Sequence, residues 1–406
     1  MSDSAESALD SLTGWTIVAF GLIVLTLVWG TIFTFTVYAE NLARAFGLSS
    51  LRVSSVFSIA TAAFYVAGGL VGVLVSRTPL RPVVAAAGLA VAGAVALLQV
   101  VTGYVGLVVA FGLLGVAGGT LFVIVISLVP QWFDVYQGRA TGITLIGNGL
   151  GVLILPFVWV WLLEWTDIRG AFAVVGGATA AVVLLGSLVS RRPPGVRAAG
   201  AAGIDRAWLA STFRDRRFQL AIVGFPLLWG WYFVLSSSLV DILTTAGIAR
   251  SVAATAFGII GGVSIVARIL SGVLADRIDP RLTFLGGVVV AAAGMVVLTF
   301  VRTPLVMYVS LVTFGLGLGA IAALFSPVIV SAFGRENATA VVGLFTISET
   351  LTSFLAPIGM NALSTATGGY AVPLAGVVAM TLLGGAMFYW GTGRADRADR
   401  PSASTA

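Results

Sequence analysis

Cysteine, histidine and lysine are all missing from the 406 residues, and charged residues make up only 9% of them. Without cysteine and histidine the chain has no disulfides, no thiolate chemistry and none of the usual nitrogen or sulfur ligands of a metal ion. We therefore expect no metal site, and nothing in the sequence implies a cofactor. Any proton relay must run through carboxylates, and all 22 basic residues are arginine.

The shortage of charge also excludes a large surface in contact with water. Soluble domains carry roughly 25% charged residues, whereas 59% of this chain is hydrophobic and its mean hydropathy is +1.07. The apolar residues form runs such as 15–37, 53–75 and 282–301, each close to the ~20 residues that a helix needs to cross a bilayer. Strands of a membrane barrel would alternate in polarity over ~10 residues. The continuous runs predict an all-α protein embedded in a lipid bilayer.

Twelve runs are long enough to be transmembrane helices. The segment before the first run lacks the basic leader and cleavage site of a signal peptide, so we expect the first helix to remain as a span. The predicted spans are residues 14–38, 53–75, 82–101, 105–129, 139–163, 170–189, 218–240, 252–275, 282–301, 304–332, 338–363 and 370–390.

The arginines predict the orientation of these spans. An even number of spans puts both termini on one side. Of the 22 arginines, sixteen fall on that side, five on the other side and one, Arg268, inside a span. Positive charge collects on the cytoplasmic side, so we expect both termini in the cytoplasm and a multi-pass protein of the cell (inner) membrane. The pI near 10.2 then reflects loop charges, and we expect no nucleic-acid partner.

The two halves of the chain repeat each other. A shift of 200 residues places Trp29-Gly30 on Trp229-Gly230, and Arg77 and Arg81 on Arg277 and Arg281; a shift of 201 places Asn148 on Glu349 and Pro156 on Pro357. Parallel repeats of this kind are typical of transporters whose substrate site lies at the midplane between the halves. We predict two pseudo-symmetric six-helix bundles, at residues 1–190 and 218–393, a cytoplasmic linker at 191–217 with a short amphipathic helix near 208–213, and a cytoplasmic tail at 394–406. We expect the protein to be a monomer.

On these features the chain resembles the major facilitator superfamily over its whole length. The segment Gly272-Val-Leu-Ala-Asp276-Arg277-Ile-Asp-Pro-Arg281 is similar to that superfamily's cytoplasmic signature, whereas its copy at residues 72–81 has Ser76 in place of the acidic residue. The resemblance implies a gate. The Asp276 carboxylate would dock on a helix of the other half, with Arg139 as its partner and Arg277 beside it.

A narrower resemblance is to the monocarboxylate transporters and the oxalate/formate antiporters. It rests on Gly14-Trp15, on Phe46-Gly47-Leu48-Ser49, on Gln131-Trp132-Phe133 followed by Gly138-Arg139-Ala140, and on Ser264-Ile-Val-Ala-Arg268. Arg268 matches the arginine that holds the substrate carboxylate in that family. Ser264 stands where the monocarboxylate transporters have an aspartate as a proton site, so proton coupling by that route is lost.

Arg268 is also anomalous by itself. A mid-bilayer arginine costs about 2.5–3.5 kcal/mol on insertion scales, and Arg268 lies roughly 10 Å from the end of its helix at a rise of 1.5 Å per residue. A planar guanidinium in a desolvated cleft suits recognition of a carboxylate. A snorkelling side chain or a structural salt bridge is the alternative.

Glu349 is the second anomaly, because it lies in the middle of the eleventh span, where the oxalate transporters carry a lysine. One cation and one carboxylate suit a monovalent anion or a zwitterion rather than a dicarboxylate. Glu349 would serve as the proton-coupling carboxyl or as the counter-ion of Arg268, and a purely structural pair of the two residues remains an alternative. Asp241, at the end of the seventh span, is expected to be solvated.

Asn148 is the repeat mate of Glu349, and its amide either lines the substrate site or makes a packing hydrogen bond. The first helices of the two halves supply Trp29, Tyr38, Trp229 and Tyr232 as candidate walls and hydroxyl donors of the same site, although most membrane aromatics serve packing or anchoring.

The sequence leaves more than one function open. The first is secondary transport of small monocarboxylates, such as lactate, pyruvate or formate, by alternating access, with or without a proton. The alternative is an exporter of drugs or amphipathic cations that uses Glu349. Neither a nucleotide-binding loop nor a catalytic triad is present in the sequence, so an enzyme is not expected.

Overall fold

The computed structural model describes residues 11–74, 79–133, 136–193, 206–333 and 338–393. Within these residues, 12 helices are long and apolar enough to cross a membrane, which confirms the predicted all-α membrane fold. The predicted tail and residues 194–205 of the predicted linker lie outside the described residues.

The described helices of the first half follow the predicted spans closely, except at the first one. They are α2 (Leu12–Ile32), α3 (Phe35–Phe46), α4 (Ser50–Leu74), α5 (Leu80–Val100), α6 (Tyr104–Leu128), the short η2 (Val129–Trp132), α7 (Gln137–Trp165) and α8 (Ile168–Ser187).

The described helices of the second half are longer than predicted at several ends. The short helix expected near residues 208–213 is α9 (Arg206–Arg214). It is followed by α10 (Arg216–Thr245), α11 (Arg250–Arg277), α12 (Pro280–Thr299), α13 (Pro304–Phe333), α14 (Ala338–Thr367) and α15 (Ala371–Gly391).

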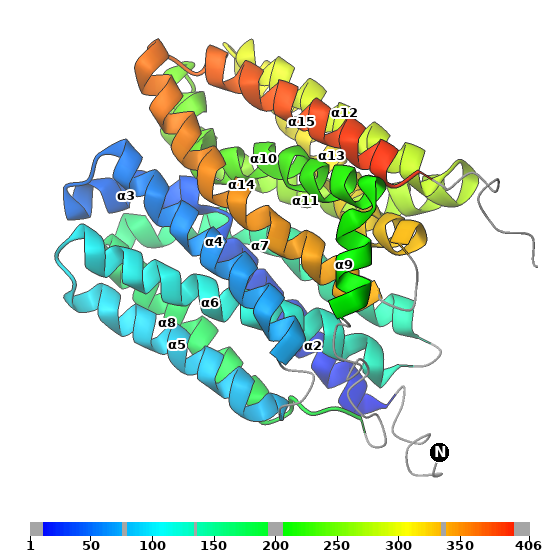
Figure 1. Ribbon diagram of the computed structural model, residues 1–406. Helices are drawn as coiled ribbons and strands as arrows, with labels where there is room; N and C mark the ends of the chain where they lie inside the picture. The colour runs from blue at the N-terminus through cyan, green and yellow to red at the C-terminus, as the bar shows by residue number, and fades with distance from the viewer. Residues whose placement is uncertain (1–10, 75–78, 134–135, 194–205, 334–337, 394–406) are drawn as a thin grey trace, which may run out of the picture.

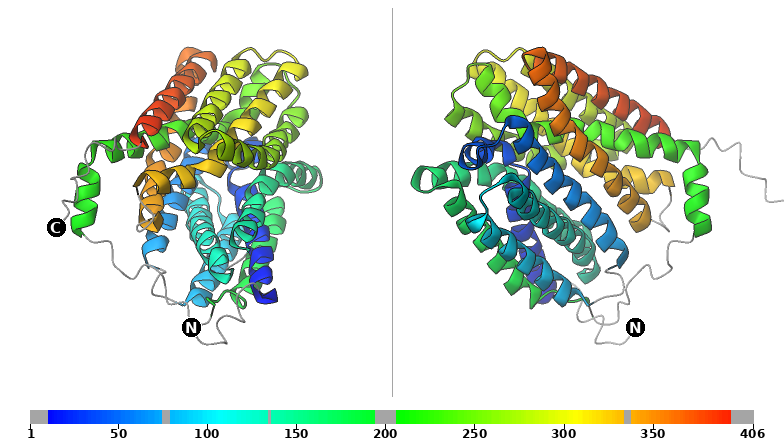
Figure 2. Two further views of the ribbon diagram at one scale, coloured as in Figure 1. Left: turned by 90° about the vertical axis from the view of Figure 1, so that its right-hand side faces the viewer. Right: turned by 60° about the vertical axis from the view of Figure 1, so that its left-hand side comes forward.

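The helices form two groups that lie side by side, α2 to α8 in blue to green and α10 to α15 in green to red (Figures 1 and 2). α9 lies at the end of the molecule where α2 begins and α15 ends, and α3 lies at the opposite end (Figure 1). We call these two ends the α9 face and the α3 face.

The first predicted span is broken, where a continuous helix was expected. α2 ends at Ile32 and α3 begins at Phe35. The Thr34 hydroxyl donates to the Gly30 carbonyl, and the Tyr38 hydroxyl donates to the Thr31 carbonyl. These side chains satisfy carbonyl oxygens that the interrupted helix leaves free, which is the condition for irregular backbone at membrane depth. The break was not visible in the apolar run because hydropathy does not record such bonds.

Glycine lets helices approach closely at several points of the structure. At Gly119 of α6 an added Cβ would overlap the Phe64 carbonyl of α4, and at Gly151 of α7 it would overlap the Thr26 carbonyl of α2. Such backbone-to-backbone contact is a common way for membrane helices to associate.

The two groups meet most extensively along two helix pairs, α4 with α14 and α7 with α11, and α3 also contacts α10. On the first pair, the Asn361 amide donates to the Ser54 hydroxyl, and the Thr61 hydroxyl donates to the Ser353 carbonyl at 3.2 Å. On the second pair, an added Cβ at Gly261 would lie 2.7 Å from the Gly149 carbonyl oxygen. These interfaces bring the candidate residues of the two halves together.

Candidate functional site

Arg268 points from α11 toward the other half of the protein. Its Nη1 donates a hydrogen bond of 2.7 Å to the Leu145 carbonyl oxygen of α7. Its Nε is buried and has no hydrogen-bond partner among the described residues. The next two side chains of α11, Ile269 and Leu270, are exposed, so the lipid-facing side of α11 is a different one. The guanidinium is therefore directed at the interface between the halves.

Tyr232 of α10 and Trp29 of α2 join the halves close to Arg268. The Trp29 Nε1 donates to the Tyr232 hydroxyl at 2.9 Å, and the Tyr232 ring lies 5.5 Å from the ring of Phe33, at the break between α2 and α3. The Tyr232 hydroxyl is also within electrostatic range of the Arg268 guanidinium. Two predicted aromatic residues thus lie at the interface with the predicted arginine.

Glu349 of α14 is buried, with 7% of its surface exposed. The Tyr65 hydroxyl of α4 lies near its carboxylate across the interface. Tyr65 is itself buried and was not singled out from the sequence. A signal was available, because Ser54, Ser58, Thr61 and Tyr65 recur every three or four residues and so share one face of their helix.

Arg268 and Glu349 do not form an ion pair. The ion pairs between residues that the structure describes are Arg44–Glu40, Arg250–Glu40 and Arg250–Asp241, and all three lie at the α3 face. The predicted counter-ion pairing is therefore not present in this state. Arg268 donates to a backbone carbonyl, and the polar neighbour of Glu349 is the Tyr65 hydroxyl.

Asn148 and Trp229 bring further polar atoms to the same region. The Asn148 Oδ1 and the Trp229 Nε1 are buried and have no partner among the described residues. Asn148 follows Leu145 by three residues on α7, so the two share a helix face, and the Trp229 ring lies 6.0 Å from that of Tyr232. Buried polar atoms normally have partners, which makes these atoms available to a ligand. We call Arg268, Tyr232, Trp29, Trp229, Asn148, Tyr65 and Glu349 the interface cluster.

Tyr38 does not join the interface cluster, although the sequence placed it with the substrate-binding candidates. It is fully buried, and its ring packs within the first half against Trp159 at 4.7 Å and Phe172 at 5.1 Å. Because its hydroxyl already donates to Thr31, Tyr38 stabilises the break between α2 and α3.

The predicted gating residues lie toward the α9 face. Arg139 is exposed, with its guanidinium 5.6 Å from the centre of the Tyr136 ring. Arg277 is exposed at the last residue of α11. The side chain of Asp276 lies outside the described part of the structure, and its predicted docking stays a prediction.

A groove on the second half lies away from the interface cluster. It measures about 370 Å³ and is lined by residues of α11, α12 and α13, including Leu270, Leu274 and Gly286. Several of its lining side chains are exposed, which places the groove on the outer surface of the second half.

Comparison with known proteins identifies the family to which these features belong. The sequence profile of the Major Facilitator Superfamily matches residues 18–357, and a second match covers residues 220–404. The chain belongs to the Major Facilitator Superfamily. It is a transporter of that superfamily and not an enzyme, and the predicted fold is confirmed.

Its relatives include named transporters at low sequence identity. Monocarboxylate transporter 3 of Rattus norvegicus is 26% identical over 380 residues, which cover 89% of this chain and 76% of that protein. Monocarboxylate transporter 13 of Bos taurus is 27% identical over 270 residues, 66% of this chain and 63% of that protein. The MFS-type transporter pytF of Aspergillus terreus is 31% identical over 169 residues, 41% of this chain and 55% of that protein.

Solved structures share the fold of this superfamily chain. A bacterial homologue of the human lysosomal transporter Spinster, inward-facing and unoccupied, superposes with a TM-score of 0.71 at 15% identity, covering 94% of this chain and 98% of that one. The nucleoside transporter NupG, as its D323A mutant, gives a TM-score of 0.72 at 14% identity, covering 91% and 98%. At these identities the similarity concerns the fold alone.

Proposed function

We propose that the protein is a secondary active transporter of small monocarboxylates and that Arg268 binds the carboxylate of the substrate. The observation that carries this proposal is the direction of Arg268, from a membrane-spanning helix toward the opposite half. A guanidinium has five N–H donors, and a neutral carbonyl oxygen leaves its charge uncompensated. An anion that arrives between the halves supplies the missing charge and favours bidentate hydrogen bonding.

The other members of the interface cluster support a small, singly charged substrate. Tyr232 and Asn148 offer a hydroxyl and an amide beside Arg268, and the indoles of Trp29 and Trp229 offer apolar walls with N–H groups. The Glu349 carboxylate would repel the second charge of a dicarboxylate. The relatives named monocarboxylate transporters favour the same substrate class.

Glu349 is the proposed proton-coupling group. Ser264, which occupies the place of an acidic residue in the monocarboxylate transporters, is buried and donates to the Gly261 carbonyl at 2.7 Å, so it offers no titratable group. Glu349 is the one buried carboxylate of the interface cluster, and the neighbouring Tyr65 hydroxyl belongs to the other half. A proton that binds Glu349 would change this contact between the halves.

The proposed orientation puts the α9 face in the cytoplasm of a cell membrane, following the arginine distribution. Cross-half contacts at the α3 face, such as Val240 N–H to the Thr36 hydroxyl at 2.8 Å, support a state that is closed on the outer side. The chain would work as a monomer, with substrate, protons and lipid as its partners.

Uptake into proteoliposomes tests the proposal. Labelled lactate, pyruvate, formate and oxalate are compared with and without a pH gradient, for the wild type and for Arg268→Gln. Monocarboxylate uptake that exceeds oxalate uptake and is lost in Arg268→Gln supports the assignment. Full uptake by Arg268→Gln would overturn it. Transport of a lipophilic cation that depends on Glu349, with no monocarboxylate uptake, would favour the exporter function instead.

A further inference from the structure

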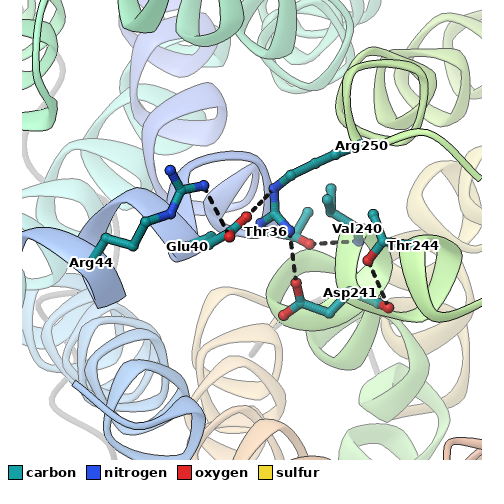
Figure 3. A network of polar contacts seen from close by, with 7 residues as sticks. All are labelled: Thr36, Glu40, Arg44, Val240, Asp241, Thr244 and Arg250. Atoms are coloured by element: carbon teal, nitrogen blue, oxygen red, sulfur yellow. Dashed lines mark hydrogen bonds and ion pairs between the residues drawn. The ribbon is translucent and has the colours of Figure 1, made fainter. Parts of the chain in front are cut away.

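Four charged residues gather at the α3 face, where the halves meet (Figure 3). Arg250, at the start of α11, pairs through its Nε with the Glu40 carboxylate of α3. Its Nη1 lies 3.5 Å from Oδ1 of Asp241 on α10. Glu40 has a second partner, because the Nη2 of Arg44 lies 2.9 Å from its Oε1. We call these four residues the outer cluster.

Only one ion pair of the outer cluster crosses between the halves. Glu40 and Arg250 belong to different halves, whereas Arg44 and Glu40 are one turn apart on α3 and Asp241 and Arg250 are both in the second half. The crossing partners Arg250 and Glu40 each have, in addition, a partner of opposite charge within their own half.

The crossing pair lies beside a second contact that also has to break if the halves separate there. The Val240 backbone N–H donates to the Thr36 hydroxyl at 2.8 Å, and Figure 3 shows this bond next to the Arg250–Glu40 pair. Tyr370, outside the spans, also faces Asp241. Its burial, followed by the charge of the Asp241 carboxylate, raises the pKa of Tyr370 to about 12. Tyr370 therefore stays neutral at ordinary pH and adds no charge.

We infer that the outer cluster is an exchangeable latch for the α3 face. The Glu40–Arg250 pair holds this face closed. When the face opens and this pair breaks, Glu40 stays paired with Arg44 and Arg250 stays paired with Asp241. The latch concerns alternating access in a transporter of this superfamily and does not depend on which solute is carried.

The geometry explains why such a latch can open readily. Removing one partner of a buried ion pair leaves an uncompensated charge, which is strongly unfavourable. Here both crossing residues keep a partner of opposite charge after separation. The side chains of Arg250 and Glu40 are also 33% and 36% exposed, so water can solvate their charges when the pair breaks. A pair that is only partly buried contributes less than a fully buried one, so the closed state would be favoured only modestly.

Substitutions of the crossing residues, Glu40 and Arg250, and of their partners, Arg44 and Asp241, should therefore change the open fraction of the α3 face in opposite directions. Loss of a crossing partner, in Glu40→Gln or Arg250→Gln, removes attraction from the closed state. Loss of Arg44 or Asp241, in Arg44→Gln or Asp241→Asn, removes an ion pair that would remain after the halves separate, and so makes the open state less favourable. It also relieves like-charge repulsion in the closed state, where two arginines share Glu40 and two carboxylates share Arg250.

The natural absence of cysteine allows a single reporter to measure the opening. Ser58 of α4 is fully buried, lies about two turns from the α3 face, and shares a helix face with Ser54 and Thr61, which contact α14. With Ser58→Cys, a membrane-impermeant maleimide added from the α3 face in sealed proteoliposomes reports the open fraction. Arg302→Gln, which removes an exposed arginine in the loop between α12 and α13, is the matched control.

The expected result is a labelling rate raised up to about fivefold by Glu40→Gln and Arg250→Gln, lowered in Arg44→Gln and Asp241→Asn, and unchanged in Arg302→Gln. Each direction has two variants, so one that does not fold, as judged by gel filtration, leaves the other to decide. A shift of all four variants in the same direction, or rates equal to that of the control, would overturn the latch.

Discussion

The Arg268 guanidinium donates to the Leu145 carbonyl oxygen, which lies on α7 in the other half, at 2.7 Å. This bond fixes the side chain across the interface without neutralising it, because a carbonyl has no net charge. An arginine held in a membrane span without a carboxylate partner is expensive. The arrangement resembles a binding group kept in position for an anion more than a structural salt bridge.

Replacement of Arg268 tests this interpretation most directly. Arg268→Gln keeps a donor that can reach toward Leu145 but removes the charge, so we expect monocarboxylate uptake to fall by roughly 10- to 100-fold, the loss of a charge-assisted hydrogen bond of about 1.5–3 kcal/mol. Arg268→Lys keeps the charge without the planar fork and should retain part of the uptake. Initial rates over a range of substrate concentrations give KM and kcat, and an unchanged KM in Arg268→Gln would contradict substrate binding.

The bond between Trp29 and Tyr232 links the halves beside Arg268. We expect a double-mutant cycle of Trp29→Phe and Tyr232→Phe to give a coupling free energy of about 0.5–1.5 kcal/mol in the melting of the detergent-solubilised protein, as for one neutral hydrogen bond. Phenylalanine keeps an aromatic ring at position 29, whose indole stacks on Phe33 at 4.5 Å. Strictly additive single mutants would show that the bond does not contribute to this state.

The spans, and the unusual position of Arg268 inside one of them, could be predicted from sequence because each depends mainly on the hydropathy of one continuous segment. An apolar run of about 20 residues has few soluble alternatives, and a charge inside such a run must have a reason. The break at Phe33 and Thr34 was not predictable in this way. It depends on hydroxyl-to-carbonyl bonds of Thr34 and Tyr38, which leave the hydropathy of the run unchanged.

The sequence failed where an interaction depends on the approach of distant helices. Tyr65 is one of many aromatic residues in the predicted spans, and only the packing of α4 against α14 brings the Tyr65 hydroxyl close to Glu349. Asp241 was expected to be solvated, and it is 41% exposed, yet Arg250 reaches it. Asp241 and Arg250 lie near the ends of their helices, and Glu40 follows the predicted end of the first span. Charge needs no explanation at such positions, so nothing in the linear sequence indicates that the three residues meet.

Replacement of Glu349 tests whether this residue couples substrate transport to protons. Glu349→Gln keeps the side-chain size and a polar group near the Tyr65 hydroxyl, but it cannot bind and release a proton. We expect this variant to lose uptake driven by an inward proton gradient and to retain exchange of labelled for unlabelled monocarboxylate. Both rates are measured in the same proteoliposomes, with Tyr65→Phe as a control that keeps the carboxyl group. Gradient-driven accumulation at the wild-type level in Glu349→Gln would exclude Glu349 as the coupling group.

Gly261 of α11 tests the close contact that brings Arg268 to α7. A Cβ at this position would lie 2.6 Å from the Leu153 backbone nitrogen and 2.7 Å from the Gly149 carbonyl oxygen, so neither neighbour is a side chain that can rotate away. Gly261→Ala must push the two helices apart, and we expect a loss of about 1–3 kcal/mol in stability together with weaker uptake.

Gly272→Ala, on the same helix, is the matched control, because a Cβ there meets nothing within 4 Å and alanine favours the helix. Scanning fluorimetry compares the two melting temperatures. Since the α7–α11 contact joins the two halves, equal melting of both variants would mean that this contact is absent from the dominant state in solution, and the position of Arg268 beside Leu145 would have to be revised with it.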